Sequence, residues 1–201
     1  MATEFDKLKQ AVDNGARVIN VSGLTSASAK ACVLTRLQTQ NGKSFAIVAD
    51  SNTDLESWMC DLDFFASKGK GETESSGSQI IALPSFEADP YSGVSPHAET
   101  QERRALALWH LASGNPSFVV LSARCLIQRT VTPEQIEALG ATLVVDKDFP
   151  PDTLVERLVA GGYVREDPLF GPGQFSVRGG IVDVWSPDEV SPVRIEFFGD
   201  T

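Results

Sequence analysis

A pair of glycines, Gly179-Gly180, separates two short runs of alternating side chains, and no other feature of the sequence constrains the fold as strongly. The two runs are residues 175–178 and 181–185. Consecutive glycines can adopt the positive φ angles of a two-residue turn, so this segment predicts a β-hairpin. In that register one face of the hairpin is apolar, with Phe175 opposite Val184 and Val177 opposite Val182.

The other face of this hairpin mixes charged groups with large apolar groups. Residues 193–197 alternate in the same way after a proline-bounded loop and predict a third, antiparallel strand. Charged groups on a sheet face are often solvated and paired with one another, as Arg178 could be with Asp183. Arginines beside exposed aromatic groups are also typical of protein-binding surfaces, so both interpretations stay open. The residues expected on this face are Ser176, Arg178, Ile181, Asp183 and Trp185.

The first part of the chain alternates apolar runs of strand length with segments of helical periodicity. Strands separated by helices predict a parallel sheet built from βαβ units. Asn41-Gly42 is expected to end one helix, Ser95-Pro96 to begin another, and residues 68–78 to form a surface loop. The predicted helices are residues 5–12, 29–37, 54–65 and 104–111, and the predicted strands are 18–21, 45–49, 80–83 and 118–121.

A change of pattern near Leu126 predicts two domains. Residues 1–126 are expected to form the parallel-sheet domain, and residues 127–201 a small α+β domain with an antiparallel sheet. The chain stops directly after its last predicted strand, as expected for a fragment of a longer protein. The second domain is expected to contain helices at 134–139 and 152–159, a strand at 142–145 and the three strands described above.

The composition excludes several classes of function. A formal net charge of −10 and a pI of about 4.6 argue against a general nucleic-acid-binding surface, because such binding requires lysines and arginines that neutralise phosphates. Cys32, Cys60 and Cys125 are too far apart in sequence for a zinc site, and buried, reduced thiols are the simplest interpretation. We therefore expect no metal. We also expect no membrane partner, because no apolar run approaches the ~20 residues that span a bilayer. These features predict a cytoplasmic protein.

The segment after the first predicted strand occupies the place of a nucleotide-binding P-loop. A functional loop needs two glycines, a lysine for the phosphate oxygens and a hydroxyl group for magnesium. When the pattern starts at Gly23, Ser28 takes the place of the second glycine, Ala29 that of the lysine and Lys30 that of the hydroxyl residue. Without the lysine and the magnesium ligand, phosphoryl transfer loses most of its electrostatic stabilisation. The sequence therefore predicts a degenerate nucleotide site that does not bind ATP.

No other segment predicts catalysis. His97 and His110 are the only histidines, and neither has a neighbouring set of residues that forms a catalytic group. Cys125 has no accompanying histidine and carboxylate in the sequence. We therefore expect no catalytic residue and no cofactor in this chain.

Three segments, in order along the chain, resemble one protein family. Residues 83–91, Gly162-Tyr163-Val164-Arg165 and the hairpin segment 173–185 are similar to sequences of the UvrB-homology family. Bacterial transcription-repair coupling factors share this homology with the excision-repair subunit UvrB. Gly180 stands where UvrB has an acidic residue, which favours the coupling-factor branch.

The resemblance implies a fold and a function for each domain. The first domain would be a P-loop-NTPase-like scaffold whose nucleotide site is degenerate. The second would dock the damage-recognition subunit UvrA, with Arg165 and Arg178 at the matching motif positions. Arg194 extends this set, because the strand pattern places it on the same face.

The resemblance also implies a longer parent protein. That parent would be an ATP-dependent DNA translocase that displaces stalled RNA polymerase from duplex DNA and recruits nucleotide excision repair. This chain would be its non-catalytic recruitment module. Two alternatives remain open: a fragment of a UvrB-like ATPase or helicase, and a small-ligand-binding α/β protein that uses Gly23 and the helix after it.

Overall fold

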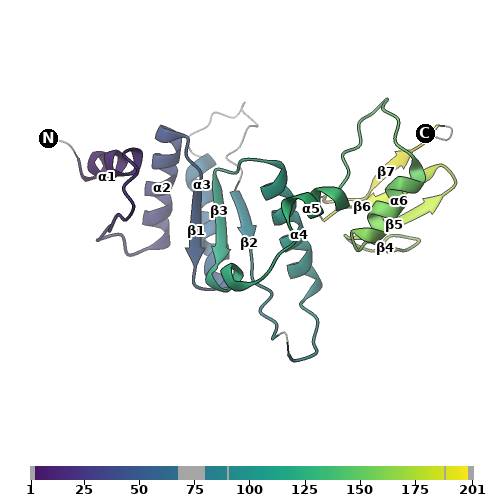
Figure 1. Cartoon of the computed structure of the whole chain (residues 1–201), viewed down its shortest axis with the longest axis horizontal. Coiled ribbons are helices and arrows are strands. Elements are labelled where there is room, and N and C mark those ends of the chain that lie inside the picture. Colours follow the sequence, from purple (N-terminus) through teal and green to yellow (C-terminus); the bar gives the residue numbers. More distant parts are fainter. Residues whose placement is uncertain (1–2, 68–79, 90, 188, 199–201) are drawn as a thin grey trace. The chain divides into compact units, whose positions relative to one another are not determined.

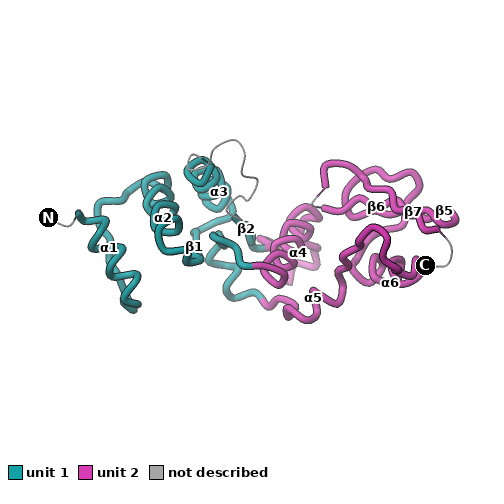
Figure 2. The backbone as a smooth tube through the Cα atoms, turned by 90° about the horizontal axis from the view of Figure 1, so that it is seen from above, with its two compact units in different colours: residues 1–85, 115–128 teal, residues 86–114, 129–201 magenta. Residues whose placement is uncertain are grey.

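The computed structural model describes residues 3–67, 80–89, 91–187 and 189–198 and contains two separate β-sheets (Figure 1). The chain divides into two compact units (Figure 2). The first unit consists of Met1–Ser85 and Asn115–Gln128, and the second of Phe86–Gly114 and Arg129–Thr201. The α/β class predicted from the sequence is confirmed, and the predicted loop at residues 68–78 lies outside the described residues.

The first unit is built on a parallel sheet of three strands in the order β1-β3-β2. Ile47 and Ala82 both lie in register with Val120 of the central strand. The prediction of a parallel sheet made from βαβ units is therefore confirmed. The strands are β1 (Phe45–Ala49), β2 (Ile80–Leu83) and β3 (Phe118–Ser122).

Two helices bury their apolar residues against one face of this sheet. Helix α2 begins at Ser26, whose hydroxyl oxygen accepts a hydrogen bond from the N–H of Ala29, and ends at Gly42 in the left-handed conformation, as Asn41-Gly42 predicted. The core formed with α3 consists of Ala31, Ile47, Ala49, Leu55, Leu62, Phe118 and Val120. The helices of the first unit are α1 (Glu4–Asp13), α2 (Ala27–Asn41), α3 (Asn52–Ser67) and the 3₁₀ helix η1 (Ala123–Ile127).

The prediction of strands at residues 18–21 and 142–145 is wrong. Neither segment has strand structure, and Val18, Val21, Val144 and Val145 are all exposed. A strand is held by hydrogen bonds to a neighbouring strand, and no described strand pairs with either segment. A segment of four residues, three of them apolar, is too short a signal to predict such a partner.

The second unit contains a mixed sheet in the order β4-β5-β6-β7. β5, β6 and β7 are antiparallel as predicted, but β4 pairs in parallel with β5, which corrects the prediction of a purely antiparallel sheet. The predicted register of the hairpin is confirmed, with Val177 opposite Val182 and Phe175 opposite Val184. The strands are β4 (Val164–Arg165), β5 (Gln174–Arg178), β6 (Ile181–Trp185) and β7 (Val193–Glu196).

Glycine is required at both positions of the hairpin turn for structural reasons. Gly179 has a φ of +61°, which side-chain-bearing residues rarely adopt. A Cβ atom at Gly180 would lie 2.9 Å from the carbonyl oxygen of Phe197, whose own N–H donates to the carbonyl oxygen of Gly180. The turn therefore needs one glycine for its dihedral angle and the other for space.

The inner face of the second sheet packs against helix α6. Leu154 and Leu158 of this helix form a buried cluster with Phe175 and Val182 of the sheet. The helices of this unit are α4 (Ala98–Ser113), α5 (Pro133–Leu139) and α6 (Pro151–Ala160). Among the residues that the structure describes, no helix has the length and apolar character needed to cross a membrane.

Helices α4 and α5 approach closely at Gly140, which caps the end of α5. A Cβ atom at this position would lie 2.0 Å from the ring of Trp109 on α4. Gly140 has extended dihedral angles that any residue adopts, so glycine is needed here for space alone. We expect Gly140→Ala to lower the free energy of unfolding by about 1–3 kcal/mol, because the half-buried indole ring must move. Urea unfolding followed by tryptophan fluorescence measures this change.

Gly171→Ala is the matched control for this substitution. Its Cβ atom would meet no atom within 4 Å, and its φ is not in the left-handed region. We expect its effect to stay within about 0.5 kcal/mol. Equal stabilities of the two variants would contradict the close packing of α4 and α5.

Candidate functional site

The outer face of β5, β6 and β7 carries four charged groups in neighbouring positions: Arg178, Asp183, Arg194 and Glu196. Strand pairing places Ser176, Asp183 and Arg194 in one row across the three strands. Arg178 and Ile181 occupy the next row, in which Ile181 also lies opposite Glu196. Alternation along each strand directs these side chains away from the core that packs on α6.

Arg178 forms an ion pair with a carboxylate from outside the strands. Asp167, in the segment between β4 and β5, accepts a hydrogen bond from Nε of Arg178 at 2.9 Å and a second, shorter one from a terminal guanidinium nitrogen. This segment is held by Gln174, whose Oε1 accepts the N–H groups of Phe170 and Gly171 at 2.7 and 3.1 Å. The alternative partner considered from the sequence, Asp183, is not the one that binds Arg178.

Asp183 instead pairs with Arg194 on the neighbouring strand. Nε of Arg194 lies 2.7 Å from Oδ1 of Asp183, and the second guanidinium nitrogen lies 3.0 Å from Oδ2. The two groups differ in exposure, with 15% of the Asp183 side chain and 56% of the Arg194 side chain accessible to solvent. The carboxylate is thus sheltered while much of the arginine remains available.

A shallow cavity of about 420 Å³ lies over this face. Proline and leucine side chains line it together with both guanidinium groups, and its polar lining includes Ser176, of which only 2% is exposed. Trp185 belongs to the same face, is half-buried and donates its indole N–H to the carbonyl oxygen of Glu189 at 3.0 Å. The residues around the cavity are Pro168, Leu169, Ser176, Arg178, Asp183, Pro192 and Arg194.

Arg165 lies on the edge strand β4 of the same sheet. It belongs to β4, where it is in register with Phe175, and its guanidinium group lies 3.4 Å from the carbonyl oxygen of Val177. Its side chain is exposed, and among the described residues it forms no salt bridge. Of the three arginines predicted as site residues, the structure places Arg178 and Arg194 around one cavity, and Arg165 lies on the edge strand.

The ion pairs shift the pKa values of their members. Hydrogen bonds from Arg178, followed by its charge, lower the pKa of the Asp167 carboxyl below its ordinary value of 3.8 and raise the pKa of Arg178 in turn. Hydrogen bonds from Arg194 lower the pKa of Asp183 in the same way. All four groups are therefore charged at neutral pH, and the two pairs together carry no net charge.

The segment predicted to be a degenerate nucleotide loop has a different arrangement. Gly23 has a φ of +86° and lies in an irregular segment rather than after a strand. The hydroxyl of Ser28 donates to the carboxylate of Asp61 at 2.9 Å, and Lys30 is exposed. Ala29 contributes the N–H that Ser26 caps. The loop therefore lacks the strand that precedes a P-loop, and the side chain of Ser28 is bonded to α3.

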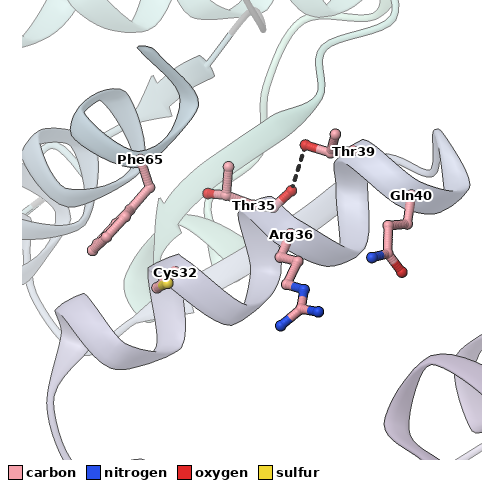
Figure 3. A pocket seen from close by; sticks show the side chains of 6 residues that line it. All are labelled: Cys32, Thr35, Arg36, Thr39, Gln40 and Phe65. Atoms are coloured by element: carbon pink, nitrogen blue, oxygen red, sulfur yellow. Dashed lines mark hydrogen bonds between the residues drawn. The ribbon is translucent and has the colours of Figure 1, made fainter. Parts of the chain in front are cut away.

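A second cavity, of about 250 Å³, lies on helix α2 (Figure 3). Phe65 of α3 lines it beside five residues of α2, and the hydroxyl of Thr39 donates to the carbonyl oxygen of Thr35 at 2.9 Å. The side-chain oxygen of Thr35 is buried and has no hydrogen-bond partner. No periodic pattern distinguishes these residues in the sequence, because they are ordinary positions of an amphipathic helix.

The histidines and cysteines take part in no metal site in the part of the chain that is described. No group of three or more histidine, cysteine, aspartate or glutamate residues could hold a metal ion there. Cys125 is buried as expected, but Cys32 and Cys60 are exposed, which corrects the prediction of three buried thiols. His97 caps the start of α4 without a side-chain hydrogen bond.

Comparison with known proteins first defines the class of the region that carries the charged face. Residues 141–201, which include α6 and the whole mixed sheet, match the family model described as the UvrB interaction domain.

Individual relatives then cover most of the chain. It is 38% identical over 184 residues to the transcription-repair-coupling factor of Myxococcus xanthus, covering 91% of this chain and 15% of that protein. The transcription-repair-coupling factor of Mycobacterium tuberculosis is 40% identical over 131 residues, or 62% of this chain and 10% of that protein. UvrABC system protein B of Chlorobium limicola is 28% identical over 199 residues, or 97% of this chain and 29% of that protein. The predicted resemblance is confirmed: this chain carries the homology that transcription-repair-coupling factors share with UvrB.

We expect the carboxyl groups of Asp167 and Asp183 to titrate below 3.8. Both pKa values are lowered in the folded state, so the stabilisation from each pair is present above the unfolded-state pKa. It is lost as the pH falls through the folded-state pKa. Carboxyl ¹³C resonances followed by NMR from neutral to acidic pH measure both midpoints.

Arg194→Gln provides the control for this titration. It should return the midpoint of Asp183 toward 3.8 and leave that of Asp167 low, because Arg178 remains in place. Unchanged midpoints in the variant would show that the ion pair does not set the pKa of Asp183.

Proposed function

We propose that this chain is a non-catalytic docking module that recruits UvrA in transcription-coupled nucleotide excision repair. The observation that carries the proposal is the position of the charged face. Arg178 and Arg194 border one cavity on the stretch that matches the UvrB interaction domain. Arg165, Arg178 and Arg194 are the proposed contacts with UvrA.

The chemistry of this face supports protein binding. A guanidinium group is planar and presents parallel N–H donors that match a carboxylate, so arginines at an interface give both affinity and orientation. More than half of the side chains of Arg178 and Arg194 is exposed, at 55% and 56%. Pro168, Leu169 and Pro192 add apolar area beside them. Such a mixture of arginine and apolar surface is typical of the centre of an interface.

The parent protein proposed for this module is an ATP-dependent DNA translocase that displaces stalled RNA polymerase in the cytoplasm. The chain spans about 15% of the Myxococcus xanthus relative, and we assign those activities to the remainder of such a parent protein. We further propose that residues 1–126 derive from a P-loop-NTPase-like domain and act as a scaffold, with residues 127–201 as the docking domain. The parallel sheet of the first unit supports that origin.

The structure around Gly23 favours the docking function over a UvrB-like ATPase. A working P-loop presents backbone N–H groups and a lysine to the phosphates. Here the Ser26 side chain caps the first turn of α2, and Ser28 is bonded to Asp61. We expect calorimetric titration with Mg-ATP to give no binding heat. Saturable binding that Lys30→Ala abolishes would support the ATPase alternative.

Calorimetric titration of the chain with UvrA tests the docking function. We expect Arg178→Ala and Arg194→Ala each to weaken binding by about tenfold, because truncation of a central arginine at an interface typically costs 1–2 kcal/mol. Arg165→Ala should weaken binding by a smaller factor, about two- to fivefold, as an exposed charge at the edge of the site.

Arg129→Ala is the matched control, because Arg129 is an exposed arginine that lies outside the charged sheet face. It should bind UvrA with the affinity of the unchanged chain. The proposal fails if the folded wild-type chain does not bind UvrA, or if the control weakens binding as much as Arg178→Ala does.

A further inference from the structure

The arginines proposed to bind UvrA already hold carboxylates of their own chain. Arg178 uses Nε and a terminal nitrogen to bind Asp167, and Arg194 uses the same two positions to bind Asp183. These two positions form the side edge of the guanidinium group, one of the two edges with which arginine binds a carboxylate through parallel hydrogen bonds. A carboxylate of a partner can form the same bidentate contact only if the internal carboxylate leaves.

Asp167 is the internal carboxylate that can leave most easily. About half of its side chain, 51%, is exposed, and it belongs to the segment that connects β4 to β5 rather than to a strand. Exposed ion pairs contribute little to stability, because both groups are well hydrated when separated. Asp183 differs in this respect, since it lies on the central strand β6 and only 15% of its side chain is exposed.

Arg165 provides a contrast at the edge of the sheet, where its register with Phe175 places it on the side of α6 rather than on the outer face. It donates one long hydrogen bond to a backbone carbonyl and, among the described residues, faces no carboxylate in a salt bridge. It is thus the arginine of this set that forms no salt bridge with another described residue. A negatively charged partner at the outer face therefore meets two arginines that are already bonded to carboxylates.

We propose that Asp167 and, to a lesser extent, Asp183 are internal competitors that occupy the side edges of the two guanidinium groups until carboxylates of the partner replace them. This inference rests on the proposed docking function and specifies the chemistry of the partner surface. That surface presents at least one carboxylate to Arg178 and an apolar group toward Pro168 and Leu169. The internal ion pairs lower the affinity for any acidic partner and hold the arginines extended in the free protein.

The substitution Asp167→Asn in the full 201-residue chain tests the proposal. Asparagine keeps the size of the side chain but removes its charge, so Arg178 is released. We expect UvrA to bind this variant roughly two- to fivefold more tightly than the unchanged chain, which is the range for an exposed ion pair. In an Arg178→Ala background the same substitution should change the affinity by less than about 1.5-fold, because the guanidinium group that Asp167 binds is absent.

Glu166→Gln is the matched control. Glu166 is the exposed neighbour of Asp167, and its substitution changes the net charge equally without releasing Arg178. We expect its affinity to equal that of the unchanged chain. Asp183→Asn is a second test on the other arginine, and thermal unfolding of each variant confirms that it is folded.

The possible outcomes separate this inference from the docking function. If the wild-type chain binds UvrA and Asp167→Asn binds it equally or more weakly, Asp167 does not compete for Arg178. The docking function is unaffected by that result. Equal tightening by Glu166→Gln also overturns the competition, because a general charge effect would then explain the gain. A folded wild-type chain that does not bind UvrA overturns both.

Discussion

The packing of Phe175 and Val182 against Leu154 and Leu158 is the interaction on which the candidate site depends. These four side chains are at least 91% buried, and burial of one large apolar side chain contributes about 1.5–3 kcal/mol. Because neighbouring residues of a strand face opposite sides, this packing determines which residues face outward. A shift of one residue would turn Arg178 toward the helix and expose the core, so the apolar cluster fixes the charged face as firmly as it fixes the fold.

The charged face thus combines a hydrogen-bonded sheet with ion pairs that are exposed to solvent. Its backbone is held by the hairpin and by β7, whereas the ion pair between Asp167 and Arg178 joins a strand to a surface segment. Asp183 and Arg194 lie directly opposite each other on β6 and β7, so their pair also supports the sheet. A surface of this kind can exchange one internal carboxylate for an external one without disturbing the fold below it.

The hairpin could be predicted from the sequence, because Gly179-Gly180 indicates a two-residue turn and such a turn determines which residues of the two strands lie opposite each other. The ion pairs could not be predicted in the same way. Asp167 reaches Arg178 from a segment with no periodic pattern, and the position of such a segment depends on contacts such as those of Gln174. The wrong prediction of strands at residues 18–21 and 142–145 has a similar explanation. A mostly apolar segment shows that a strand is possible, but the strand that must pair with it lies elsewhere in the chain.

Hydrogen exchange of this chain with and without UvrA is the most direct test of the central claim, that the outer face of β5, β6 and β7 is the docking surface. The account predicts slower amide exchange on binding at residues 164–178 and 181–196, with residues 27–67 unchanged. Protection confined to the first unit, or absent from β5 to β7 when UvrA is bound, would contradict it.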